Sequence, residues 1–330
     1  MITANKIPSV FGQVKQGVNS SKWGKRSASL ILPILGVILF LGIWNAVAKT
    51  IDTSLGQFPG PSQVWEQASV LIDEHIEQRN KAEAFYERQE QRNAQRVAAD
   101  PSYEPKIRPF TGAPTFFEQI WTSLYTVMVG FVIASIVAVP VGIACGLSKS
   151  MYAAINPLIQ LFKPVSPLAW LPLVTMIVSA VYVSEDPMFA KSFVTSAVTV
   201  SLCCLWPTLI NTAVGVSSID NDLVNVSKVL RLNALTHVIK IVLPSSIPMI
   251  FTGLRLSLGI GWMVLIAAEM LAQNPGLGKF VWDEFQNGSS ESLARIMVAV
   301  LTIGLIGFVL DRMMLLIQRA VSWDKSAVTR

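Results

Sequence analysis

The chain has 330 residues, of which 52% are hydrophobic and 14% are charged, and its formal net charge at pH 7 is +5. Soluble domains carry about 25% charged residues, so this composition excludes an ordinary soluble protein and favours one with much of its surface in lipid. Membrane proteins collect Lys and Arg in cytoplasmic segments, and without a basic stripe interleaved with aromatic residues the positive charge predicts no nucleic-acid partner.

The first 48 residues predict a basic tail followed by a membrane span. Residues 28–48 form an apolar run long enough to cross a bilayer. Ala46-Val47-Ala48 also fits a signal-peptidase site, although the basic region and the apolar run are both long for a signal peptide. The tail at 1–27 has no acidic residue, so we expect it in the cytoplasm; its basic residues are Lys6, Lys15, Lys22, Lys25 and Arg26.

Residues 49–118 predict a hydrophilic periplasmic segment. A turn and a short amphipathic helix are expected over 57–75, with Ser62 as N-cap, and a polar helix over 73–99 that Asp100-Pro101 ends. The polar helix is either a solvated spacer, which its few apolar residues favour, or a docking surface for a solute-binding protein. The predicted apolar face and the predicted i,i+4 ion pair are Trp65, Ala68 and Ile72, and Glu77 with Lys81.

The remaining chain predicts five more spans and a short cytoplasmic tail at 319–330. Its fold class is therefore an all-α polytopic membrane protein with about six transmembrane helices. Six spans return the C-terminus to the cytoplasm and place the basic loop 217–240 there too. The second predicted span of these five is interrupted by Lys163 and by Pro164, Pro167 and Pro172. The five are about 120–147, 155–183, 193–216, 241–271 and 293–317.

The loop 217–240 contains an amphipathic segment. The pattern predicts one short helix over 222–235, which Val242-Leu243-Pro244 separates from the next span. An amphipathic helix in a cytoplasmic loop needs a partner's groove for its apolar side. The apolar residues are Leu223, Val226, Val229 and Leu230.

This loop resembles the cytoplasmic loop of bacterial ABC importer permeases, which carries a Glu-Ala-Ala signature and ends in Leu-Pro. Aligned on Leu243-Pro244, the Glu-Ala-Ala positions fall at Asn225, Val226 and Ser227. The signature glycine falls at Arg231, a departure that disfavours the tight turn usual in this coupling element. The resemblance implies that the ATPase is contacted by Asp222, Leu223, Asn225, Val226, Ser227, Leu230, Arg231 and Pro244.

Flanking motifs extend the resemblance over about residues 115–320 and place it in the nitrate, sulfonate, taurine and bicarbonate branch. Phe251-Thr252-Gly253-Leu254-Arg255 and Val281-Trp282-Asp283 look most like nitrate-type permeases. The other matching stretches are Asn156-Pro157, Lys163-Pro164, 167–173, 206–215, Ala267-Ala268-Glu269-Met270 and Gly276-Leu277-Gly278.

The resemblance implies the fold and partners of a type I ABC importer permease over residues 119–318. Two copies of the chain would sit in the bacterial inner membrane over two ATPase subunits, which bind ATP and Mg, and a periplasmic receptor would deliver the solute. The chain has no GxxxxGK[ST] sequence of its own, which agrees with this division. The expected solute is a small oxyanion, most simply nitrate, with nitrite or bicarbonate as alternatives; no catalytic residue, cofactor or metal site is predicted.

Ionisable residues inside spans are candidate sites, because they are costly in lipid. Arg255 either attracts a planar oxyanion or pairs with another span. Glu269 lies about 40° from Arg255 around a continuous helix, on a face with Gly259, Trp262 and Ile266, and suits a structural or gating role better than anion binding. Lys163 either reaches the interface or contacts solute. The candidate translocation path comprises Arg255, Trp262, Glu269, Lys163, Asn211 and Thr212.

The sequence favours two other functions less. An ion-coupled secondary carrier would usually show internal repeats, and no convincing repeat is visible. An intramembrane enzyme is disfavoured because His75 and His237 are the only histidines and form no HExxH pair. Cys145, Cys203 and Cys204 lie in apolar runs and predict small core residues rather than disulfides.

Overall fold

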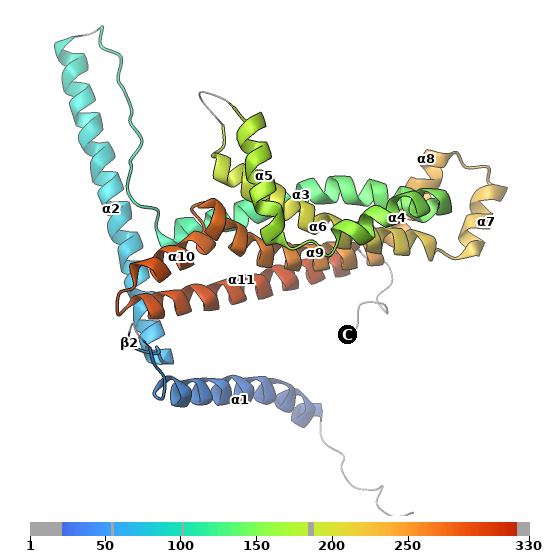
Figure 1. Ribbon diagram of the computed structural model, residues 1–330, viewed down its shortest axis with the longest axis horizontal. Helices are drawn as coiled ribbons and strands as arrows, with labels where there is room; N and C mark the ends of the chain where they lie inside the picture. Colours follow the sequence, from blue (N-terminus) through green and yellow to red (C-terminus); the bar gives the residue numbers. More distant parts are fainter. Residues whose placement is uncertain (1–21, 54–55, 101, 184–187, 322–330) are drawn as a thin grey trace, which may run out of the picture. The chain divides into compact units, whose positions relative to one another are not determined.

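A computed structural model describes residues 22–53, 56–100, 102–183 and 188–321, most of them as α-helix (Figure 1). The chain divides into two compact units, Met1–Pro61 and Ser62–Arg330, and each is described by itself. Within the described residues, five helices are long and apolar enough to cross a membrane, and a bent helix pair raises the number to six. The predicted all-α polytopic fold is confirmed.

The first unit contains one membrane-length helix and a small hairpin. Helix α1 (Lys22–Ala48) includes the predicted span, and its side chains from Ile31 to Phe40 are exposed, as lipid-facing apolar residues would be. Strands β1 (Asp52–Thr53) and β2 (Gly56–Gln57) pair antiparallel. The indole Nε1 of Trp44 donates to the carbonyl of Pro59 at 3.1 Å. Most of the predicted tail, residues 1–21, lies outside the described residues.

Helix α2 (Pro61–Ala99) is one continuous helix of 39 residues. The predicted N-cap at Ser62 is wrong: the helix already begins at Pro61, which suits a first helical position because no N–H is needed there. The predicted apolar face is also wrong. Val64 and Leu71 are buried, whereas Trp65 is 78% exposed, because the inward face lies one residue earlier in the helical repeat. The end before Asp100 is confirmed.

The chain after α2 returns alongside the same helix (Figure 1). Gln89 makes two hydrogen bonds with the backbone of Arg108, one from its Nε2 to the carbonyl at 3.1 Å and one to its Oε1 from the N–H at 2.7 Å. The Phe110 N–H donates to the hydroxyl of Tyr86 at 3.1 Å. The predicted Glu77–Lys81 ion pair is present at 2.6 Å. These hydrogen bonds hold the returning segment against α2.

Helices α3 (Phe116–Leu147), α6 (Lys191–Ser217) and α9 (Leu243–Ala272) form the centre of the second unit. Val127, Val200 and Leu265, one from each helix, are fully buried. Helices α10 (Leu277–Asn287) and α11 (Ser292–Val321) pack against each other and against α9. Four predicted spans thus correspond to α1, α3, α6 and α11, and the span at 241–271 corresponds to α9.

The predicted span at 155–183 is not one helix. It is replaced by α4 (Lys149–Phe162) and α5 (Pro167–Val181), which meet at an angle of 100°. Pro167 explains the break, because a proline disfavours helical backbone at the residue before it. Ser166 accordingly has an extended ψ of 139°.

The cytoplasmic loop predicted over 217–240 contains helices α7 (Asn221–Val229) and α8 (Ala234–His237) and a π-helical turn, η1 (Val238–Val242). A single helix over 222–235 is therefore wrong, because the chain turns at Arg231. Pro244 does not end a helix either: α8, η1 and α9 run on without a break. The hydrogen-bond register changes beside Pro244, which has no N–H to lose.

Candidate functional site

Helix α7 is closed at both ends by specific hydrogen bonds. The Asp220 carboxylate caps its start by accepting from the Asp222 N–H at 3.0 Å. At its end, the N–H of Arg231 donates to the carbonyl of Lys228 and that of Leu232 to the carbonyl of Ser227, both at 3.1 Å. These two bonds define a Schellman ending, which needs a left-handed residue.

Arg231 supplies that left-handed residue, with φ of 51°. This is the position that aligns with the signature glycine of the permeases that the loop resembles, where the sequence disfavours a tight turn. The structure contradicts that expectation, because the turn is formed by an arginine. A non-glycine residue in this conformation costs about 1–2 kcal/mol.

The predicted coupling residues divide into an exposed set and one buried residue. Ser227 is buried, and its Oγ lies 2.7 Å from Nδ1 of His237, so it fastens α7 to α8. The apolar residues of α7 remain uncovered within the described chain, and Val229 is 81% exposed. The exposed coupling residues are Pro244 at the start of α9 and, in or directly after α7, Asp222, Leu223, Asn225, Val226, Leu230 and Arg231.

Arg255 pairs with an acidic residue of another span. Its Nε lies 2.5 Å from Oδ1 of Asp311 in α11, and its Nη2 donates to Oδ2 at 3.1 Å. The two side chains are 36% and 37% exposed and line a cavity of about 490 Å³ beside α9. The Arg255 charge is therefore matched locally by a carboxylate.

Trp262 and Glu269, predicted on the same face as Arg255, are buried in contacts between helices. The indole Nε1 of Trp262 donates to the carbonyl of Ile303 in α11 at 3.0 Å. The Arg255–Trp262 part of this α9 face thus lies against α11. Its role in the translocation path stays a prediction.

The carboxylate of Glu269 joins three helices. It accepts from the Ser123 hydroxyl of α3 at 2.8 and 2.9 Å and from the Gly278 N–H of α10 at 3.0 Å. The same hydroxyl accepts from the Leu277 N–H at 2.9 Å. A Cβ at Gly276 would lie 2.1 Å from a carboxylate oxygen, so this position has no space for a side chain. The geometry suits the structural role considered for Glu269.

Asn211 and Thr212 lie at close contacts of α6 with its neighbours. The amide of Asn211 donates to the carbonyl of Pro207 at 2.8 Å, and its Cβ faces Gly253 of α9. Thr212 is fully buried against Gly142 of α3. Small residues allow such close approach between membrane helices. Both residues therefore pack helices in this structure.

Lys163 lies at the break between α4 and α5 and is exposed. It lines a second cavity, of about 340 Å³, together with aromatic residues of α4, α5 and α6. This cavity shares Ile260 and Met263 of α9 with the cavity that contains Arg255. The structure thus places Lys163 and Arg255 in two cavities on one side of α9, apart from Glu269, Asn211 and Thr212.

Comparison with known proteins identifies the chain's family. The family model for the binding-protein-dependent transport system inner membrane component matches residues 138–323. The chain belongs to this family. The permease is thus a transport subunit of an ABC importer in the inner membrane, and the ATPase lies in separate partner subunits.

The permease has relatives of known name. The nitrate import permease protein NrtB of Leptolyngbya laminosa is 37% identical over 214 residues, which cover 64% of this chain and 72% of the relative. The bicarbonate transport system permease protein CmpB of Synechococcus elongatus is 32% identical over 299 residues, which cover 90% and 91%.

A solved structure shows the same fold. A chain of the inward-facing MetNI methionine ABC transporter superposes with a TM-score of 0.53 at 14% identity, covering 63% of the permease and 96% of that chain. This likeness concerns the fold alone and agrees with the type I permease architecture expected from the sequence. The family assignment also favours an ABC importer over the ion-coupled carrier.

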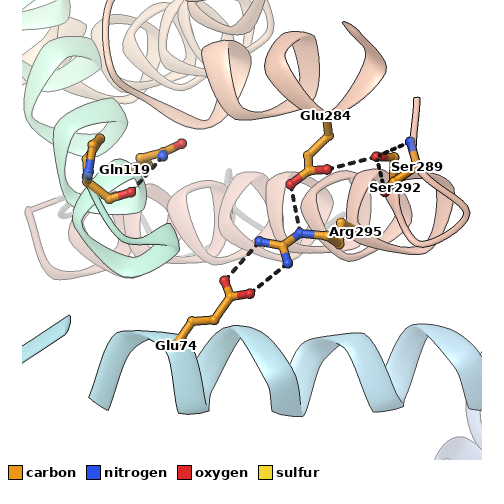
Figure 2. A network of polar contacts seen from close by, with 7 residues as sticks. Glu74, Gln119, Glu284, Ser289, Ser292 and Arg295 are labelled. Carbon is orange, nitrogen blue, oxygen red and sulfur yellow. Dashed lines mark hydrogen bonds and ion pairs between the residues drawn. The ribbon is translucent and has the colours of Figure 1, made fainter. Parts of the chain in front are cut away.

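Sequence reasoning missed two charged groups that organise the permease. Asp311 is ionisable within the last span, so the rule that selected Arg255 could have found it. The other is an ion-pair network on Arg295, which joins α2, α10 and α11 (Figure 2). Arg295 binds Glu74 through two hydrogen bonds of 2.8 and 2.9 Å and lies 2.7 Å from Glu284.

Proposed function

We propose that the permease moves a small oxyanion, nitrate in the first instance and nitrite or bicarbonate otherwise, from the periplasm to the cytoplasm. The observation that carries this proposal is the similarity to permeases named for nitrate and bicarbonate import, which reaches 37% and 32% identity. Nitrate and bicarbonate are both small planar anions with a single charge, which supports a solute of this class. A receptor in the periplasm would deliver it.

We further propose that two copies of the permease pair and that α7 of each docks on an ATPase subunit. Val226 of α7 is 49% exposed and Leu230, its C-cap, is 63% exposed. This supports the proposal, because an apolar helix face outside lipid gains free energy when it is covered. Both termini and α7 then lie in the cytoplasm. Closure of the ATPase subunits would move the spans as rigid bodies through this contact.

The test is uptake by the complete transporter in proteoliposomes, with the permease, its ATPase subunits and the receptor all present. Nitrate and bicarbonate are offered separately in isotope-labelled form, with ATP inside the vesicles. ATP-dependent uptake of either anion supports the proposal. Uptake that persists with a hydrolysis-dead ATPase and follows an ion gradient would contradict it, as would uptake of neither anion.

A further inference from the structure

The break between α4 and α5 interrupts a helix pair that is apolar enough to span the membrane. Residues 163–166 there have no regular helical structure. Irregular backbone at membrane depth is tolerated only where it is buried in protein or lines a water-filled cavity. A cavity of about 340 Å³ adjoins this break. The rule therefore favours a hydrated cavity at the break.

Lys163 is the charged residue of this cavity. It forms no ion pair with any residue that the structure describes, and no described acidic residue lines the cavity. Arg255, in the adjoining cavity, is neutralised by Asp311. Of the two cavities, the one at Lys163 therefore has the unmatched positive charge.

The other walls of the cavity are largely apolar. Phe162 and Trp206 stack with ring centroids 6.1 Å apart, and Trp170 lies 5.7 Å from Phe162. Such walls cannot replace the hydration shell of a strongly hydrated ion, which makes transfer of that ion costly. One cation among aromatic walls thus suits a monovalent, weakly hydrated anion, and a dianion would keep one charge unpaired.

We infer that the cavity at the α4–α5 break is an oxyanion site, with Lys163 as its cationic contact and a preference for nitrate or nitrite over divalent anions. This inference rests on the proposed function and adds a site and a selectivity to it. Ile260 and Met263 of α9 line both this cavity and the cavity that contains Arg255.

Lys163→Met tests the site, because methionine keeps an unbranched, similarly long side chain without the charge. In the complete transporter, we expect nitrate uptake below saturation to fall at least about tenfold, while receptor-stimulated ATP hydrolysis stays within about twofold. Lys163→Arg keeps the charge and should retain at least about a third of the uptake. The matched control is Lys149→Met at the start of α4, which lies outside the cavity and should change neither quantity.

Uptake by Lys163→Met within about twofold of wild type would overturn the inference while leaving the proposed function intact. If the wild type imports no oxyanion, the proposed function fails, and the site is then judged by binding alone. Nitrate should raise the Tm of the purified permease more than sulfate at equal ionic strength, and Lys163→Met should abolish the difference. If nitrate raised the Tm above that in sulfate by the same amount in the wild type and in Lys163→Met, the site would be overturned.

The headgroup of an anionic lipid carries one net negative charge on phosphate oxygens, as a free oxyanion does on its own oxygens, so the membrane composition is also varied. Vesicles of phosphatidylcholine alone are compared with vesicles that contain phosphatidylglycerol. The loss of uptake in Lys163→Met should be equal in both. A loss confined to vesicles with phosphatidylglycerol would identify the headgroup of an anionic lipid as the occupant and overturn the oxyanion site.

Discussion

Arg255 of α9 and Asp311 of α11 face each other as a two-point ion pair, 56 positions apart in sequence, with Nε–Oδ1 and Nη2–Oδ2 distances of 2.5 and 3.1 Å. A planar guanidinium matches a carboxylate with two parallel hydrogen bonds, and it could match a planar oxyanion in the same way. The pair therefore either holds two spans together, or Arg255 leaves Asp311 to bind the solute. These roles predict different results for paired substitutions.

Neutralising one partner leaves an unmatched charge within a span. Asp311→Asn or Arg255→Met should lower the free energy of unfolding by about 1–3 kcal/mol, less than for a fully buried pair because each side chain is about one-third exposed. Scanning fluorimetry of the purified permease measures the effect as a lower Tm.

The double variant Arg255→Met with Asp311→Asn separates the roles. It removes both charges, so the Tm should recover most of the loss. Recovered nitrate uptake in the double variant shows a structural pair. Recovered Tm with abolished uptake assigns Arg255 to the solute.

Gly276 is predicted to tolerate no side chain. Its Cβ would lie 2.1 Å from a Glu269 oxygen, and the carboxylate cannot move aside without losing its bonds to Ser123 and Gly278. Gly276→Ala should cost about 3 kcal/mol of unfolding free energy and lower the yield of folded permease. Fluorescence-detected size exclusion and Tm measure it.

The control is Gly304→Ala in α11, where an added Cβ would meet nothing within 4 Å. A helical glycine is less stable than alanine, so this variant should be neutral or gain up to about 1 kcal/mol. Equal losses in both variants would show that the Glu269 contacts do not fix the position of Gly276.

Arg231→Gly should stabilise the coupling loop. Glycine adopts φ of 51° without the steric cost that arginine bears, although it adds freedom to the unfolded chain, so the expected net gain is about 0.5–1 kcal/mol. Hydrogen exchange of the amides at 227–232 should slow correspondingly. Lys228→Gly, inside the last turn of α7, should instead destabilise the loop by about 1 kcal/mol and speed the exchange. Slower exchange in both variants would contradict this account.

Arg231 also illustrates what the sequence could and could not predict. The apolar runs predicted α1, α3, α6, α9 and α11, because lipid requires about 20 apolar residues for a span whatever the tertiary contacts. The left-handed arginine runs against local preference and is held by the bonds of Ser227 and Lys228 with the loop. Local patterns carry no information of that kind.

The candidate site was predicted less completely than the spans. The prolines beside Lys163 signalled an interruption, but the 100° bend and the cavity depend on how α5 packs on α6 and α9. Arg255 was identified as a costly charge within a span, yet its partner could not be assigned without the crossing of α9 and α11. Residues 222–235 were predicted as one helix because apolar spacing alone does not show where a chain turns.

Charge on the exposed face of α7 should release the ATPase subunits. Val226→Glu or Leu230→Glu would bury a carboxylate in an apolar contact, so co-purification of the ATPase should fall at least about tenfold. Val97→Glu is the matched control, since Val97 lies on α2 and is 38% exposed, close to the 49% of Val226. Unchanged co-purification by both α7 variants would contradict docking through this face.

Glu74 is predicted to anchor α2 to the membrane helices through Arg295 (Figure 2). Glu74→Gln weakens two charge-assisted hydrogen bonds but leaves the contact of Arg295 with Glu284, and Glu74 is 46% exposed, so the expected cost is only about 1 kcal/mol. If cleavage follows local opening, trypsin should then cut at Arg79 and Lys81 about fivefold faster.

Glu77→Gln is the control for this anchor. Glu77 forms a surface ion pair with Lys81 within α2, at exposed fractions of 65% and 54%, and such a pair is worth about 0.3–0.5 kcal/mol. Cleavage should therefore rise less than about threefold. His75 still holds α2 through its 2.8 Å contact with Thr115 at the start of α3, so adding His75→Ala to Glu74→Gln should accelerate cleavage further. Equal rates for Glu74→Gln and Glu77→Gln would show that Arg295 does not anchor the helix.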